Sequence, residues 1–149
     1  MNRTKAPATR VLPWLTAVWV FSVALEAQAP AEPFQPVATM KQLMVEIVYP
    51  ASNELLLAVN RGGPGDEKEW AAVRRSAMTL AESGNLLIMR NGAAGWVADA
   101  KALVTAGASA YQAAQSKDRK ALAALVDSLD ASCTTCHKQF RPSVFPPAR

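Results

Sequence analysis

Both cysteines and the only histidine of this 149-residue chain lie within five consecutive positions, Cys133-Thr-Thr-Cys136-His137. Thiols and imidazoles are side chains that bind metals, form disulfides or attach haem covalently. On a helix the three positions are i, i+3 and i+4, so their side chains project from one face. An explanation of the spacing should therefore use all three groups together.

Three common explanations leave one of the groups without a role. A structural zinc site needs four cysteine or histidine ligands, and the chain has three such residues. A thioredoxin-type Cys-x-x-Cys pair starts a helix after a strand, but no strand pattern precedes Cys133. A disulfide between Cys133 and Cys136 would distort the helix and leave His137 unexplained.

Cys-x-x-Cys-His is instead the sequence signature of covalent haem attachment. Two thiols at this spacing can add to the two vinyl groups of the porphyrin, and the adjacent imidazole can bind the iron from one side. We therefore expect one haem c, attached through Cys133 and Cys136 and ligated by His137.

The N-terminus has the order of a secretory signal peptide. Arg3, Lys5 and Arg10 precede the uncharged apolar run 11–25, and small residues follow it. The run is shorter than the ~20 residues that a membrane-spanning helix needs. The sequence predicts that residues 1–29 are cleaved, that the mature protein has no stable membrane insertion, and that it is periplasmic, since haem attachment of this type occurs outside the cytoplasm.

The remaining charge says little about partners. Two cleavage sites stay open, one after Ala29 and one after Ala31. Cleavage after Ala29 removes three of the 16 basic and one of the 12 acidic residues, which leaves 13 basic and 11 acidic residues and a net charge of +2. No basic cluster is interleaved with aromatic residues, so we expect no binding of nucleic acid.

The rest of the chain has the pattern of four helices. After a Pro-rich segment, residues 30–36, apolar residues recur at spacings of three and four between short breakers. The predicted inner faces are Val37, Met40, Met44, Ile47, Val48, Ala51, Leu55 and Ala58; Trp70, Val73, Ala77, Leu80, Leu87 and Ile88; Trp96, Ala100, Leu103, Val104, Gly107, Tyr111 and Ala114; and Leu122, Leu125, Val126, Leu129, Cys133, Cys136, His137 and Phe140. With short connections and no period-two pattern, we expect an all-α, antiparallel up-down-up-down four-helix bundle over residues 37–142, followed by a tail, 143–149.

Single residues predict local features of these helices. Pro50 cannot donate a backbone hydrogen bond, which predicts a kink near residues 46–50. Asp66 and Glu69 have the spacing of a capping box, and Asp118 is a good N-cap. Gly107 would allow another backbone or a ligand to approach closely.

The chain resembles the class II c-type cytochromes, the cytochrome c prime family. Its attachment site lies near the C-terminus and continues as Cys136-His-Lys-Gln-Phe-Arg141, where this family commonly has an aromatic residue followed by arginine. The other matching segments are Thr39-Met-Lys-Gln-Leu-Met44, Tyr49-Pro-Ala-Ser52, Trp70-Ala-Ala-Val73 and Leu80-Ala-Glu-Ser-Gly-Asn-Leu-Leu87. The resemblance implies Arg141 in the proximal haem pocket, redox partner proteins, and dimers of the kind that relatives often form through their first two helices.

The second axial ligand of the iron decides the function. His137 is the only histidine, so methionine is the remaining strong ligand, and the resemblance places the distal residue on the first helix. Met44 matches that position, and Met40 is the alternative. We expect a six-coordinate Met/His iron and a periplasmic one-electron carrier that is not an enzyme. The alternatives are a five-coordinate cytochrome c prime that binds NO or CO, and a haem subunit of a larger oxidoreductase.

Overall fold

The structure, a computed structural model, describes residues 34–90, 92–141 and 143. All regular structure in these residues is helical, and none of them lies in a strand, so the all-α prediction is confirmed. None of the helices in this part of the chain is both long and apolar enough to cross a membrane. The predicted signal peptide, Pro142 and the tail beyond Ser143 lie outside the described residues.

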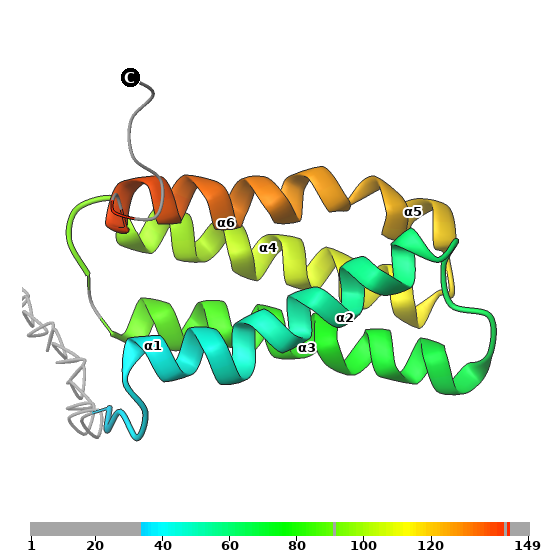
Figure 1. Cartoon of the computed structure of the whole chain (residues 1–149), viewed down its shortest axis with the longest axis horizontal. Helices are drawn as coiled ribbons and strands as arrows, with labels where there is room; N and C mark the ends of the chain where they lie inside the picture. The colour runs from blue at the N-terminus through cyan, green and yellow to red at the C-terminus, as the bar shows by residue number, and fades with distance from the viewer. Residues whose placement is uncertain (1–33, 91, 142, 144–149) are drawn as a thin grey trace, which may run out of the picture. The chain divides into compact units, whose positions relative to one another are not determined.

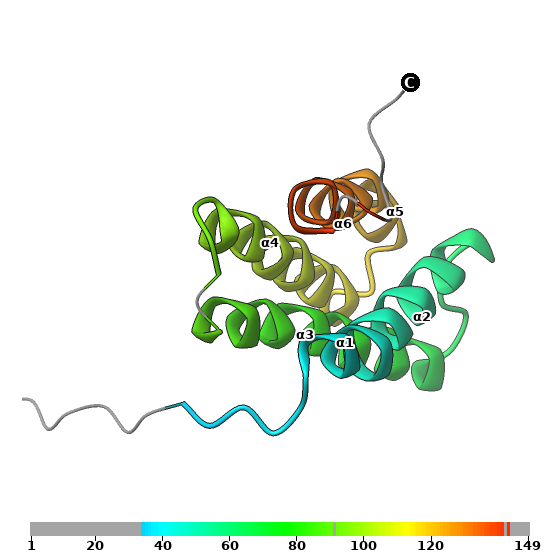
Figure 2. The same cartoon turned by 60° about the vertical axis from the view of Figure 1, so that its left-hand side comes forward.

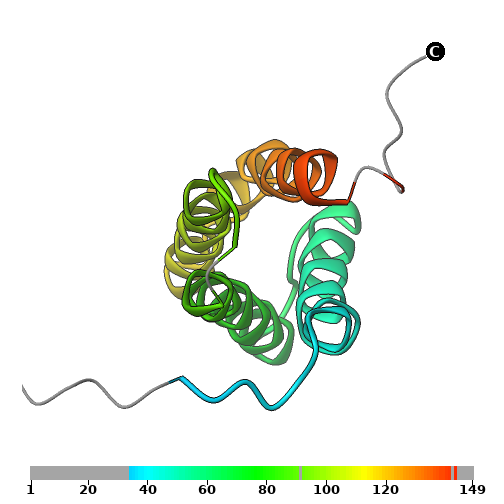
Figure 3. The same ribbon diagram turned by 90° about the vertical axis from the view of Figure 1, so that its left-hand side faces the viewer.

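The helical segments fall into four stretches (Figure 1). The first contains α1 (Met40–Gln42), the π-helix η1 (Leu43–Val48) and α2 (Tyr49–Asn60); the second is α3 (Glu67–Met89), the third is α4 (Trp96–Gln115), and the fourth contains α5 (Arg119–Ala124) and α6 (Val126–Phe140). Figures 2 and 3 show the stretches side by side around a common interior. Helix α3 contacts α2 and α4, and α4 contacts α6, so the fold is bundle-like.

The core contains most of the predicted inner faces. The buried residues that were predicted are Val48, Ala51 and Leu55 in the first stretch; Trp70, Val73, Ala77, Leu80 and Leu87 in α3; Trp96, Ala100, Leu103, Gly107 and Ala114 in α4; and Leu122 and Leu129 in the fourth stretch. The predicted attachment residues on α6 are only half-buried. Cys136 and Phe140 nevertheless pack against the apolar core from its edge.

The first stretch differs from its predicted register. Val37 precedes the first helix and is fully exposed, and Ile47 is 38% exposed, so the prediction that both are buried is wrong. Leu43, which was not predicted on the inner face, is buried, and so is Val48, which was predicted there; the two lie five positions apart within η1. An α-helical period of 3.6 residues does not place these two positions on one face, whereas a π-helix does.

Pro50 gives the physical reason for the π-helix. In an α-helix, its missing N–H and its ring would disturb the bond to the carbonyl of Glu46. The structure shows a wider turn directly before the proline, in which the N–H of Tyr49 bonds the carbonyl of Met44, five residues earlier. The irregularity predicted near residues 46–50 therefore takes the form of a π-helical segment that begins at Leu43.

Two glycines let α3 and α4 approach closely. A Cβ on Gly107 would lie 2.5 Å from the backbone nitrogen of Ala81 on α3, and one on Gly84 would lie 2.9 Å from the carbonyl oxygen of Ala100 on α4. The close approach predicted at Gly107 is confirmed, and the group that approaches is the backbone of α3. Gly84 has the reciprocal role, which the sequence analysis missed.

Asp66 and Asp118 cap helices as predicted, but the structure differs from the predicted local features at Glu69 and at Leu125. Asp66 accepts a hydrogen bond from the N–H of Glu69 at 2.8 Å, but the Glu69 carboxylate accepts from the N–H of Gly65, one residue before the position that a capping box requires. Asp118 caps α5 as predicted, through the N–H of Ala121. The fourth stretch is interrupted at Leu125, between α5 and α6, and is not one continuous helix.

Candidate functional site

Helix α6 places Cys133, Cys136 and His137 on one side, facing the interior. All three side chains are half-buried, and all three line the same small cavity of about 30 Å³. Leu87 of α3 and Leu103 of α4 close its apolar sides. The i, i+3, i+4 spacing thus brings the two thiols and the imidazole together, as the sequence analysis predicted.

A second, larger cavity adjoins two of these residues, Cys133 and His137. It has a volume of about 350 Å³ and is lined by Cys133 and His137 together with residues of η1 and α2. Those residues include Tyr49, Ser52 and Leu56, which the sequence analysis did not connect with the site. These three residues recur at spacings of three and four along α2, and this helical period could have placed them on the same side of the helix. Cavities that hold ligands measure about 300–1,000 Å³, so this space has the size of a ligand site.

Met44 lines both cavities and also a third one, of about 260 Å³. It comes from η1 and shares two of these cavities with Cys133 and His137 of α6. Met40 lines only the third cavity, beside Met44, and does not share a cavity with the cysteines or with His137. Of the two methionines considered as a distal ligand, Met44 is the one that the structure brings together with His137.

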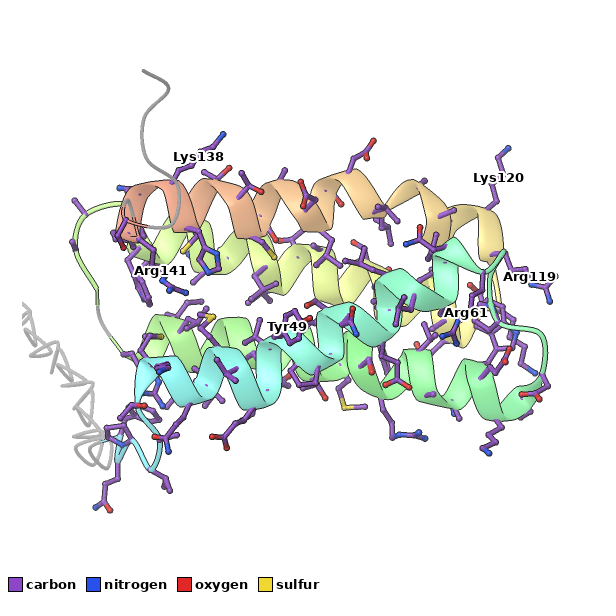
Figure 4. All side chains as sticks on the ribbon, in the orientation of Figure 1. Tyr49, Arg61, Arg119, Lys120, Lys138 and Arg141 are labelled. Atoms are coloured by element: carbon purple, nitrogen blue, oxygen red, sulfur yellow. The ribbon has the colours of Figure 1, made fainter. Side chains whose placement is uncertain are left out.

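Arg141 lies at the mouth of the site. It is exposed, its backbone N–H donates to the carbonyl of His137 at 2.8 Å, and it lines the two larger cavities (Figure 4). Lys41 lines the smaller of these two cavities with it. Two cationic side chains at the edge of an apolar space can pair with carboxylate groups of a ligand. The structure therefore puts Arg141 at a cavity that His137 also lines, and its place in a proximal haem pocket stays a prediction.

The environment of the three attachment residues favours their uncharged forms. Burial raises the pKa of the Cys133 thiol, and burial together with the Asp99 carboxylate raises the pKa of the Cys136 thiol. Burial, followed by the charge of Arg141, lowers the pKa of His137. A neutral imidazole is the form that binds a metal. At neutral pH these shifts favour two protonated thiols and a neutral imidazole.

Asp99 is a site residue that the sequence analysis missed. It lies in the first turn of α4 and lines the small cavity with Cys136 and His137. Its neighbour in the sequence, Ala100, was predicted on the inner face, so a half-buried Asp99 could have been inferred from the helical period. Its proximity to Cys136 depends on how α4 packs against α6, which the local pattern does not contain.

Contacts around Trp96 hold the surrounding helix ends together. The indole N–H of Trp96 donates to the carbonyl of Leu87 at 2.6 Å, which joins the start of α4 to the end of α3. Its ring meets Phe140 edge to face, with centroids 5.0 Å apart. The amide of Gln139 also donates to the carbonyl of Ala94 at 3.1 Å. These contacts position the C-terminal end of α6, and hence the attachment residues.

These features fit a covalently attached haem. The described residues contain no group of three or more His, Cys, Asp and Glu side chains arranged to hold a bare metal ion. They do contain two thiols and an imidazole on one side of a helix, and the thioether of Met44 lines the same cavity. A larger cavity adjoins these groups, and a buried carboxylate oxygen of Asp99 has no hydrogen-bond partner. In comparisons with protein-family models, with curated proteins and with solved structures, the chain matches none of them.

Proposed function

We propose that this chain is an exported, periplasmic monohaem c-type cytochrome of class II that carries single electrons and transforms no substrate. The observation that carries the proposal is that Cys133, Cys136 and His137 line one cavity with Met44. When bound, haem supplies one-electron chemistry through its iron. The residues of the chain hold the group: the two cysteines through thioether bonds, His137 as one axial ligand and Met44 as the other.

The position of Met44 supports electron transfer over gas binding. Met44 lines two cavities together with His137, and its backbone belongs to η1. π-Helical segments occur frequently at functional sites. A methionine and a histidine on opposite sides of a haem give six-coordinate iron of raised reduction potential. A five-coordinate iron that binds NO or CO is the second outcome, and it requires Met44 to remain outside the coordination sphere.

The same proposal includes the finer topology and the partners. The order of the four stretches and their short connections support an antiparallel up-down-up-down four-helix bundle. Electron donors and acceptors are the expected partners, and a homodimer is part of the proposal. Exposed apolar side chains along the first stretch support the dimer, since Tyr49 is 65% and Leu57 is 40% exposed. Gel filtration of wild type and of Leu57→Glu tests it: wild type elutes as a dimer and the variant as a monomer.

Production of the full chain in a bacterium with haem-attachment machinery tests the central claim. We expect the periplasmic fraction to contain a coloured protein whose mass exceeds that of the mature polypeptide by one haem. Replacement of Cys133 and Cys136 by alanine should abolish this mass gain. Thr135→Ala is the matched control, because Thr135 lies between the cysteines and is exposed. A colourless wild-type protein with two free thiols or a disulfide would contradict the proposal.

A further inference from the structure

Asp99 is a half-buried carboxylate residue at the proposed attachment site. One of its oxygens, Oδ2, is buried and has no hydrogen-bond partner. Cys136 and His137 line the same cavity as Asp99, and no lysine or arginine is among the described residues that line it. A buried polar atom without a partner is rare in proteins. A functional role of the Asp99 carboxylate at this site would account for its unpaired oxygen.

Two hydrogen-bond donors in this part of the chain bond other groups than Asp99. The hydroxyl of Ser132, in the same cavity, donates to the carbonyl of Leu129 at 2.7 Å, and the indole N–H of Trp96 donates to the carbonyl of Leu87. Asp99 lies in the first turn of α4, where the positive end of the helix dipole favours an anion. The carboxylate therefore lies at the end of the helix where negative charge is favoured.

The charge of Asp99 acts electrostatically on Cys136, because it contributes to the raised pKa of the Cys136 thiol. Charges interact strongly where little water separates them, because the effective dielectric constant is low there. Any change of charge on a group attached to Cys136 and His137 therefore changes its interaction energy with Asp99.

We propose that Asp99 sets the reduction potential of the haem and holds it low; this inference rests on the proposed function. Reduction transfers one electron from a donor protein to the iron, so the charge of the iron site falls by one. The carboxylate stabilises the more positive, oxidised state, and it opposes reduction. Asp99 thereby counteracts the raised potential that a Met/His pair produces.

Redox titrations of the haem-loaded full chain test the proposal. We expect Asp99→Asn and Asp99→Ser to shift the midpoint potential to more positive values, and Asp99→Glu to retain the wild-type potential. Asp127→Asn is the matched control, since Asp127 is an exposed carboxylate in the first turn of α6. The Asp99 shift should persist in 1 M salt, because a buried charge is screened much less than an exposed one.

Each outcome decides the proposal. A positive shift in either neutral variant that exceeds the shift of Asp127→Asn supports it. A potential that stays at the wild-type value, or that shifts only as far as the control, overturns it. Loss of haem attachment in both neutral variants, with attachment kept in Asp99→Glu, also overturns it, because the carboxylate would then serve attachment. A wild-type chain that carries no haem would instead contradict the proposed function itself.

Discussion

Met44 and His137 line the same two cavities, one from η1 and the other from α6. The two residues belong to the first and the last helical stretches, so the fold, and not the local sequence, brings them together. Met40 lies one turn earlier in the chain but lines neither of these cavities. Because only Met44 shares cavities with His137, substitution of Met40 can serve as a control for substitution of Met44 as the proposed distal ligand.

Met44→Ala should convert low-spin ferric iron to a high-spin form. The substitution removes the thioether that we propose as the distal ligand, while the thiols and the imidazole of α6 stay in place. The variant should also bind carbon monoxide promptly in its ferrous form, whereas the wild type should resist it. Absorption spectra of the oxidised and reduced proteins, with and without carbon monoxide, measure both effects.

Met40→Ala is the matched control for this experiment. Met40 is another half-buried methionine of the first stretch, and its removal should leave the spin state unchanged. Unchanged low-spin bands in Met44→Ala would remove Met44 from the role of ligand. A high-spin wild type with rapid carbon monoxide binding would favour the five-coordinate, gas-binding alternative.

The π-helical register predicts different costs for two neighbouring apolar residues. Leu43 is 1% exposed, so Leu43→Ala should lower the free energy of unfolding by about 2–5 kcal/mol, the usual cost of truncating a buried leucine. Ile47 is 38% exposed, and Ile47→Ala should cost about 1 kcal/mol or less. Urea denaturation of the purified proteins measures both values. Equal losses of unfolding free energy in the two variants, or a larger loss in Ile47→Ala, would favour the α-helical register that the sequence predicted.

Regular helices could be predicted from the sequence because their period is local. Trp70, Val73, Ala77 and Leu80 recur at spacings of three and four, and all four are buried in α3. The same rule failed around Leu43, because a π-helix adds a residue to the turn and moves the inner face. Pro50 predicted that the helix would be irregular there, but not which form the irregularity would take.

The site could be predicted in part for a similar reason. Cys133, Cys136 and His137 are close in sequence, so their shared helix side follows from the helical period alone. Asp99 could not be assigned to the site, because it reaches Cys136 only through the packing of α4 on α6. Met44 was placed there by resemblance and not by a local pattern.

The ion pair between Glu67 and Lys117 predicts a small dependence of stability on pH. The Lys117 ammonium, as hydrogen-bond donor and as charge, lowers the pKa of Glu67 from its ordinary value of 4.5. A carboxyl whose pKa is lower in the folded state contributes stability above its unfolded pKa, and this contribution is lost as the pH falls through the folded pKa. Wild type should therefore be slightly more stable than Glu67→Gln at pH 7, and the difference should vanish in acid below pH 4.5.

Urea denaturation of both proteins from pH 7 down to pH 3 measures this difference. Both partners are exposed, so the effect should be small and should weaken in high salt. Glu46→Gln is the control, because Glu46 is exposed and forms no ion pair with the residues that the structure describes. A difference that grows toward acid would have the wrong sign and would refute the assignment.

Gly107→Ala should destabilise the protein even though alanine favours helices. Alanine gains about 1 kcal/mol over glycine in a helix interior, but its Cβ would lie 2.5 Å from the backbone nitrogen of Ala81 and would push α3 away from α4. Overpacking of this kind costs about 1–3 kcal/mol. Gly65→Ala is the matched control, since its nearest contact is the flexible side chain of Glu69 at 3.4 Å. Helix α4 also carries Asp99 and Leu103 to the site, so separation of α3 and α4 should shift the midpoint potential of the haem. A variant that is as stable as wild type and has the wild-type potential would contradict this prediction. It would show that the two helices tolerate a wider spacing.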